Sequence, residues 1–254
     1  DISKFFASID HEILKQKLAK RIKDKAEVFT PSWVCNAQNN LIDNAWFGKE
    51  NVFNIEKDKS WIVNYEKVAF PQGKTWQDYV QSNRLEISCG EAPYLCSRYD
   101  TVTGKWIEVK DRIGILDRKL RIVGENTEHE EDWFEWAVNA YKATYGFEWQ
   151  GDSLLLAREN LLFTFIDYYV DKFVVFPIKE RLEEIAKILS WNIFQMDGLK
   201  FVIPNSCKPI PKMQMSLFEE DEPPEECPGC KKGNNNKHKG IYAKIMNWET
   251  KRSI

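Results

Sequence analysis

The sequence predicts an α/β protein built as one large domain or as one domain with an appendage. Short apolar segments alternate with longer amphipathic ones along most of the chain, which is typical of strands that alternate with helices. A length of 254 residues with 43% hydrophobic and 13% aromatic content is enough to bury a full core. In sheets of this class, ligands bind where the carboxyl ends of strands meet the amino ends of helices, so we expect the functional site there.

The first part of the chain is expected to be helical. Apolar residues recur at helical spacing over residues 2–23 among lysines, which is typical of a surface helix. A second helix is expected after Thr30 and Pro31, because Thr30 can cap it, Pro31 suits its first turn and Gly48 can close it. A third helix is expected to start at Thr75.

The middle of the chain is expected to add a core strand and an elaboration after it. Residues 85–88 are typical of a short buried strand that runs into a Cys-Gly turn, with a helix beginning near Ala92. Residues 99–109 are typical of a hairpin, and two more helices are expected at about 113–123 and 130–144.

The last third is expected to complete the sheet and then leave it. From residue 206 the composition turns to Pro, Glu, Lys and Asn, which indicates an excursion from the core. The expected elements are helices over 152–173 and 178–190 and short strands over 191–196 and 201–203. The expected regions are an N-terminal helix (1–26), a core (27–205), an acidic excursion (206–240) and a returning strand or hairpin (241–254).

Composition restricts the compartment and the partners. The 36 basic and 39 acidic residues give a net charge of −3, so a wide basic surface for nucleic-acid phosphates is not indicated. No apolar run reaches the roughly 20 residues that cross a bilayer, and no signal peptide is recognisable, so we expect a cytoplasmic protein without a membrane partner. The six cysteines are scattered, which favours reduced thiols over a disulfide framework.

Four short strings stand along the chain in an order that indicates one family. In residues 85–95 a strand ends in a small-residue turn, a geometry that brings backbone amides close to a ligand. With Glu86 as the strand-end acid and Cys89-Gly90 in the turn, this string resembles the Asp-Pro-x-Cys-Gly-x-Gly-x-Phe-Leu string of adenine-N6 DNA methyltransferases. Here isoleucine replaces the proline, and Ala92 replaces the second glycine. The alternative is an ordinary turn between a strand and a helix.

This resemblance implies a Rossmann-like S-adenosylmethionine methyltransferase core, preceded by an N-terminal helical region. It implies that Glu86 pairs with the ammonium group of the cofactor and that Cys89, Gly90 and Ala92 line the site. Upstream, Phe29-Thr30-Pro31 is similar to the Phe-Thr-Pro string with which these enzymes close over the methionine end of the cofactor. Its alternative is a capped helix start.

Two further strings extend the resemblance. Residues 143–161 resemble the second strand and following helix of the family, which implies that Glu148 accepts both ribose hydroxyls and that Trp149 flanks the adenine. The alternative makes Gly146 a helix C-cap and Glu148 a solvated acid. Asp197 occupies the position at which the family accepts a hydrogen bond from the cofactor adenine. Its alternative is a plain Asp-Gly turn.

The catalytic string of the family does not occur in this sequence. These enzymes hold a flipped adenine with an Asp/Asn-Pro-Pro-Tyr/Phe loop after the fourth strand, whereas the only Pro-Pro pair here, Pro223-Pro224, has no aromatic residue after it. The resemblance therefore implies a restriction–modification methyltransferase whose catalytic loop and double-stranded DNA contacts lie outside these residues, with a restriction or specificity subunit as partner. We expect the chain to be truncated before the fourth strand. The alternative is a non-catalytic binding or assembly subunit.

A separate group of residues suggests a metal site. Cys227-Pro228-Gly229-Cys230 is a knuckle of the kind that zinc ribbons use, with Cys207 upstream and His238 downstream as the remaining candidate ligands. The alternative is a pair of free thiols in an acidic loop. A zinc-stabilised nucleic-acid-binding protein is accordingly a third functional hypothesis.

Overall fold

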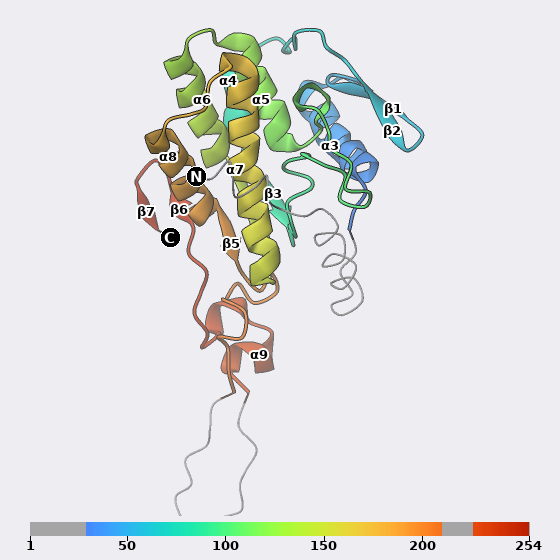
Figure 1. The fold of residues 1–254 in the computed structure, drawn as a ribbon. Helices are drawn as coiled ribbons and strands as arrows, with labels where there is room; N and C mark the ends of the chain where they lie inside the picture. The colour runs from blue at the N-terminus through green and yellow to red at the C-terminus, as the bar shows by residue number, and fades with distance from the viewer. Residues whose placement is uncertain (1–28, 210–225, 254) are drawn as a thin grey trace, which may run out of the picture.

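The computed structural model describes residues 29–209 and 226–253 as helices arranged around a small parallel sheet, a mixed α/β structure (Figure 1). The helix expected over residues 2–23 and most of the acidic run lie outside the described residues. Within the described ranges, no helix is both long and apolar enough to span a bilayer.

The sheet consists of three consecutive strands that lie side by side in chain order. Strands β3 (Arg84–Ile87), β4 (Thr144–Glu148) and β5 (Ile193–Gln195) are all parallel. Helices α5 (Ile115–Asn126) and α6 (Glu130–Lys142) connect β3 to β4, and α7 (Gly151–Phe173) and α8 (Lys179–Asn192) connect β4 to β5. The sequence patterns therefore predicted these strands and helices to within a few residues.

The two faces of the sheet differ in how they are covered. Glu86, Gly146 and Ile193 lie side by side in register on one face, and on this face Glu86 and Ile193 are buried. On the other face, Leu85 is 57% exposed and Ile87 is 68% exposed. Parallel sheets are normally covered on both faces, so the apolar face at β3 is unusual. Among the described residues, no strand pairs with the outer edge of β3.

Aromatic side chains dominate the core between the helices. Trp133 of α6 and Phe165 and Tyr169 of α7 pack together, with ring centroids 5.6–5.8 Å apart. Tyr141 extends this cluster and donates its hydroxyl to the carbonyl of Leu161. Such pairs add to the stabilisation from burial of apolar area.

Helix α3 (Ser32–Phe47) packs through an unusually polar face, with Phe47 as an apolar contact at its carboxyl end. Arg118 of α5 is buried and donates to Asp43 at 2.6 Å and to the side-chain oxygens of Asn36 and Asn40 at 2.9 and 2.7 Å. Tyr79 donates its hydroxyl to the same Asp43 carboxylate. This network fixes α3 against α5 and α4 (Trp76–Gln81).

The ends of these helices follow their sequence signals in part. Gly48 closes α3 with a φ of 68°, and Thr75 starts α4 in a capping box with Asp78. Pro31 is the N-cap residue of α3 and no side chain caps this helix, so the expected capping role of Thr30 is wrong. The Thr30 carbonyl instead accepts the hydroxyl of Thr101.

Several segments differ from the sequence-based expectation. The helix expected near Ala92 is absent, because Ala92 has a φ of 66° and Pro93 follows it. An antiparallel hairpin formed by β1 (Asn54–Lys57) and β2 (Ser60–Val63) was not predicted, and the strand expected over 201–203 is reduced to bridges at Val202. The remaining elements are the 3₁₀ turns η1 (Val109–Asp111) and η2 (Asn235–Lys237), helix α9 (Pro228–Lys232) and the terminal hairpin β6 (Met246–Asn247) and β7 (Arg252–Ser253).

Candidate functional site

A cavity of about 220 Å³ lies at the carboxyl ends of β3 and β4. Six residues that the sequence predicted as cofactor ligands line it: Phe29, Thr30, Glu86, Cys89, Gly90 and Glu148. The cavity is smaller than the roughly 300–1,000 Å³ of typical ligand pockets, so it can enclose only part of a nucleoside-sized ligand.

Glu148 is held in a fixed orientation at the end of β4. Its Oε2 accepts the amide of Gly90 at 2.8 Å, and its Oε1 accepts the amides of Trp149 and Gln150 at 2.8 and 3.0 Å. The side chain is buried, so it is not a solvated acid. A carboxylate offers about four lone-pair positions, which leaves one on Oε2 for a ligand hydroxyl.

Glu86 is the second buried carboxylate of the cavity. Its two oxygens accept the amides of Tyr94 and Leu95 over 3.4 and 3.2 Å. Burial raises the pKa of Glu86 well above its usual value, and the nearby charge of Glu148 adds to this increase, while the two amides act in the opposite direction. A bound cation would favour the ionised form of this group.

The turn between β3 and the residues that follow has an unusual backbone. Ser88, Gly90 and Ala92 all have positive φ values, of 51°, 54° and 66°. A Cβ built on Gly90 meets no atom within 4 Å, whereas Ala92 is fully buried. Position 92 thus keeps a backbone conformation that favours glycine, although an alanine occupies it.

Cys89 occupies space that a glycine on the neighbouring strand leaves open. A Cβ on Gly146 would lie 3.2 Å from Cys89 Sγ, tighter than most contacts of this kind. Gly146 lies inside β4, so its alternative role as a helix C-cap is wrong. Burial raises the pKa of the Cys89 thiol well above its usual value, which keeps it neutral and unreactive.

The charge of the cavity wall restricts its ligands. Glu86, Glu91 and Glu148 are all buried, and no lysine or arginine is among the residues that line the cavity. Buried carboxylates favour a ligand that carries a positive charge and hydroxyl groups, and they disfavour phosphates. Dinucleotides and nucleoside triphosphates therefore fit this wall poorly, whereas an ammonium or sulfonium compound fits it well.

Four of the predicted cofactor residues do not line this cavity. Pro31 lines a separate groove, and Ala92 is enclosed by the core. Trp149 is 41% exposed, and Asp197 is buried in a turn where its Oδ1 accepts the amides of Leu199 and Lys200. The alternative, a plain Asp-Gly turn at Asp197, is therefore confirmed. This turn uses Oδ1 of Asp197, so its Oδ2 can still accept a hydrogen bond.

Sequence reasoning missed other lining residues. Thr101 comes from the 99–109 segment and reaches the cavity because its hydroxyl donates to the Thr30 carbonyl at 2.6 Å. Gln150 and Ser153 belong to the start of α7, directly after Glu148. Because these two residues follow Glu148 closely, the sequence could have indicated that they line the cavity. Nothing in the sequence indicated Thr101.

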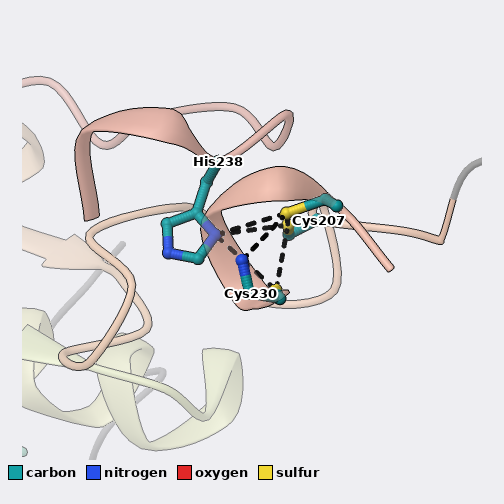
Figure 2. A group of neighbouring side chains, drawn as sticks. Cys207, Cys230 and His238 are labelled. Carbon is teal, nitrogen blue, oxygen red and sulfur yellow. Dashed lines mark hydrogen bonds between the residues drawn. The ribbon is translucent and has the colours of Figure 1, made fainter. Parts of the chain in front are cut away.

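A second site is formed by Cys207, Cys227, Cys230 and His238, whose ligand atoms all lie within 4.8 Å of one another (Figure 2). The Nδ1 of His238 is 3.6, 3.5 and 3.6 Å from the sulfur atoms of Cys207, Cys227 and Cys230. Around a tetrahedral ion with Zn–S of about 2.3 Å and Zn–N of about 2.05 Å, this separation is about 3.5 Å. All four residues that the sequence named are thus brought together as a metal-binding cluster.

The chain around this cluster is shaped to bring the ligands together. Cys227 caps α9, its sulfur accepting the Cys230 amide, and hydrogen bonds from the Cys207 thiol and this amide lower the pKa of Cys227 to about 5. A Cβ on Gly229 would lie 2.6 Å from the His238 nitrogen, so only glycine fits between the two cysteines of the knuckle. We call residues 201–209 and 226–244 the knuckle module; Figure 1 shows it extending away from the helices that surround the sheet.

Comparisons with protein-family models, with curated proteins and with solved structures found no match to this chain.

Replacement of Glu86 by glutamine should change how stability depends on pH. Because the folded-state pKa of Glu86 is raised, the folded chain binds more protons than the unfolded chain between the usual pKa of 4.5 and the raised value. The contribution of Glu86 to stability is therefore lost as the pH rises through that window, by at most about 1.4 kcal/mol per pH unit. Urea unfolding at several pH values should show a shallower decline for Glu86→Gln than for the wild type. Parallel curves would contradict the raised pKa.

Proposed function

We propose that this chain is the cofactor-binding part of a restriction–modification DNA adenine-N6 methyltransferase that uses S-adenosylmethionine. The observation that carries the proposal is the cavity at the ends of β3 and β4, with buried Glu86 and Glu148 and no cationic residue in its wall. S-adenosylmethionine supplies a sulfonium, an ammonium and two ribose hydroxyls, which are the groups that such a wall favours.

The topology supports the same proposal. Three consecutive parallel strands in chain order, joined by helices, form the arrangement found in one half of a doubly wound Rossmann-like sheet. In such sheets the ligand binds outside the carboxyl ends of the strands, and the cavity has this position.

In this proposal, the residues of the chain hold and orient the cofactor. The Gly90 amide and the carboxylate of Glu148 meet at 2.8 Å, so a ribose hydroxyl received by Glu148 is fixed relative to the turn. Glu86, at the end of the adjacent strand, pairs with the ammonium group. The cofactor supplies the methyl group, and its fixed orientation gives the proximity that in-line transfer requires.

Catalysis also requires the Asp/Asn-Pro-Pro-Tyr/Phe loop, which these 254 residues do not contain. In this proposal, a strand that carries such a loop pairs with the open edge of β3, and a helix packs over Leu85 and Ile87 on the exposed face. Double-stranded DNA with a flipped adenine would be held through those additional parts, together with a restriction or specificity subunit.

Calorimetric titration with S-adenosylmethionine tests the proposal. We expect binding to the wild-type chain, with affinity reduced at least about tenfold by Glu148→Ala, because one charge-assisted hydrogen bond contributes about 1.5–3 kcal/mol. The exposed Glu184→Ala serves as the matched control and should bind like the wild type. ATP should not bind, since its phosphates would face Glu86 and Glu91.

Glu148→Ala also removes the acceptor for three backbone amides, so a second variant is needed. Gly90→Ala leaves every carboxylate in place and its Cβ meets no atom within 4 Å, while the φ of 54° at this position costs an alanine about 1 kcal/mol, too little to unfold the chain. It should weaken S-adenosylmethionine binding while circular dichroism stays native. No heat of binding to the wild type at millimolar ligand would refute the methyltransferase proposal.

A non-catalytic subunit that binds S-adenosylmethionine and assembles with a catalytic partner is the second candidate. The exposed apolar face of β3 favours it, because that face can receive a partner as well as further chain. Two results together would distinguish this candidate from the first. The chain would bind S-adenosylmethionine strongly, and methylation of DNA would occur only after a separate partner subunit is added.

For the metal-binding cluster we propose zinc. Three cysteines and one histidine complete a tetrahedral set with no open position, which is typical of a structural rather than a catalytic ion. The third candidate function, a zinc-stabilised nucleic-acid-binding protein, is favoured by this ligand set alone. Elemental analysis of protein purified without chelator should find one zinc ion per chain.

A further inference from the structure

The segment between β3 and α5 contains a closed turn to which the cofactor proposal assigns no role. Tyr99 bridges to Trp106, and the Asp100 amide donates to the Lys105 carbonyl at 2.8 Å. We call residues 99–107 the wall turn, because its second threonine-side neighbour of Asp100, residue 101, lines the cavity. Its backbone hydrogen bonds make it a defined unit rather than a loose connection.

Two hydrogen bonds join the wall turn to the chain directly before and at the start of α3. We call Phe29 and Thr30 the strap; both residues line the cavity. The Thr101 hydroxyl donates to the Thr30 carbonyl at 2.6 Å, and the Ser32 amide donates to Asp100 Oδ2 at 2.8 Å. Ser32 is the first residue of α3, and the first amides of a helix have no partner inside it. A carboxylate from a distant part of the chain thus accepts one of these amides.

Asp100 is itself held in one orientation. Its Oδ1 accepts the amide and the hydroxyl of Thr103, both at 2.8 Å, which leaves Oδ2 for Ser32. Burial alone would raise the pKa of Asp100, but the hydrogen bonds from Ser32 and Thr103 outweigh it and lower this pKa. The carboxylate is therefore ionised at neutral pH, the form that the amino end of a helix favours.

The wall turn is attached to α7, whose first residues also line the cavity. Asn160 donates its side-chain amide to the Tyr99 hydroxyl at 2.9 Å. Next to it, Arg98 pairs with Asp167 at 2.8 Å, and both side chains of this pair are less than one-fifth exposed. A continuous series of contacts therefore runs from α7 through the wall turn to the strap.

The strap lies on the side of the cavity where Glu86 is found. Burial, together with the charges of Glu86 and Asp100, raises the pKa of the Cys35 thiol in the first turn of α3 to about 12. The Tyr94 amide donates to Glu86, while the Tyr94 side chain interacts with those of Thr30 and Cys35. Ligand groups beside Glu86 therefore meet the strap.

We propose that Asp100 and Thr101 are positioning residues that hold the strap in the cavity wall and thereby determine the affinity for the part of the ligand next to Glu86. Asp100 is not among the residues that line the cavity, so its effect on a ligand passes through the strap. A strap without these hydrogen bonds has more conformations in the free chain, and binding must then order it.

The choice of S-adenosylmethionine as ligand rests on the function proposed above, in which its ammonium group pairs with Glu86. The amino-acid end of the cofactor is then the part that depends on the strap. The attachment of the strap to the wall turn involves no ligand, so it can be measured separately.

Calorimetric titration with three ligands tests the effect on binding. S-adenosylmethionine and S-adenosylhomocysteine carry the amino-acid end, whereas methylthioadenosine keeps the adenosine part and lacks that end. Asp100→Ala should weaken binding of the first two about fivefold to tenfold and change binding of methylthioadenosine by less than about twofold. Thr101→Val should act in the same way, and Thr101→Ser, which keeps the hydroxyl, should bind like the wild type.

Asp78→Ala is the matched control for Asp100→Ala. Asp78 accepts the Thr75 amide at the start of α4, so this variant also removes a carboxylate from the amino end of a helix. Helix α4 contributes no residue to the cavity wall. The control should therefore bind all three ligands like the wild type.

Hydrogen exchange followed by mass spectrometry measures the attachment of the strap without any ligand. In Asp100→Ala, exchange over residues 29–35 should become faster, because the Ser32 amide loses its acceptor, while exchange in α6 stays unchanged. Asp78→Ala should leave residues 29–35 as they are in the wild type.

Three results would overturn the proposal. They are unchanged exchange over residues 29–35 in Asp100→Ala, equal losses of affinity in Asp100→Ala and Asp78→Ala, and equal losses for ligands with and without the amino-acid end. A wild-type chain that does not bind S-adenosylmethionine refutes the methyltransferase proposal instead. The exchange measurement then still decides whether Asp100 holds the strap.

Discussion

Removal of zinc should unfold the knuckle module while the rest of the chain stays folded. In zinc-finger peptides the ion contributes about 10–16 kcal/mol of apparent binding free energy, which is also folding free energy. The module has few apolar residues buried inside it, since Cys227 and Val202 are its only buried hydrophobic residues among those described. Its fold therefore depends on the four ligands.

Limited proteolysis with and without a strong chelator measures this effect. After chelation, cleavage should appear within residues 201–244, while the aromatic core of α6 and α7 remains resistant. Cys227→Ala should reproduce this pattern and lose the zinc. Cys35→Ala, at a buried cysteine outside the cluster, should keep one zinc per chain. Unchanged cleavage after complete removal of the metal would contradict a structural role.

Replacement of Arg118 by methionine should cost about 3–5 kcal/mol of unfolding free energy, the loss expected when one partner of a buried ion pair is removed. Asp43 would keep the Tyr79 hydroxyl as a partner but lose its countercharge. Asn36 and Asn40 would lose the donor that their side-chain oxygens share. Helix α3 would then be poorly attached to α5.

Urea denaturation at constant pH measures this loss. Arg121→Met is the matched control, because Arg121 pairs with Glu125 on the same helix, where both side chains are 18% exposed. Such a pair contributes under about 1 kcal/mol. Equal losses in the two variants would show that the buried network does not hold α3.

The part of the fold that sequence could predict is the part with strong periodicity. Helix α7 was expected at 152–173 and spans Gly151–Phe173, because its apolar residues recur over many turns. Helix α3 was predicted from its flanking signals, yet most of its buried residues are polar, among them Asn36, Asn39 and Asn40. Those asparagines are satisfied by groups distant in the sequence, which no local pattern reveals.

The residues of the two sites also divide into those that the sequence could predict and those that it could not. Glu148 is the last residue of β4 and Glu86 the last but one of β3, so their meeting at one cavity followed from the parallel order of the strands. Thr101 reaches the cavity through a hydrogen bond to Thr30, and the hairpin of β1 and β2 has short strands with polar residues, so neither had a readable signal. The four metal ligands were recognisable because cysteine and histidine are rare and their spacing is characteristic.

A crystal structure of the chain with S-adenosylmethionine tests the central claim most directly, because it locates the ligand rather than its effect. The cofactor is expected at the ends of β3 and β4, with a ribose hydroxyl within hydrogen-bond distance of Glu148 Oε2 and the ammonium group beside Glu86. Ligand density at another place on the chain, or none in this cavity at saturating concentration, would contradict the assignment.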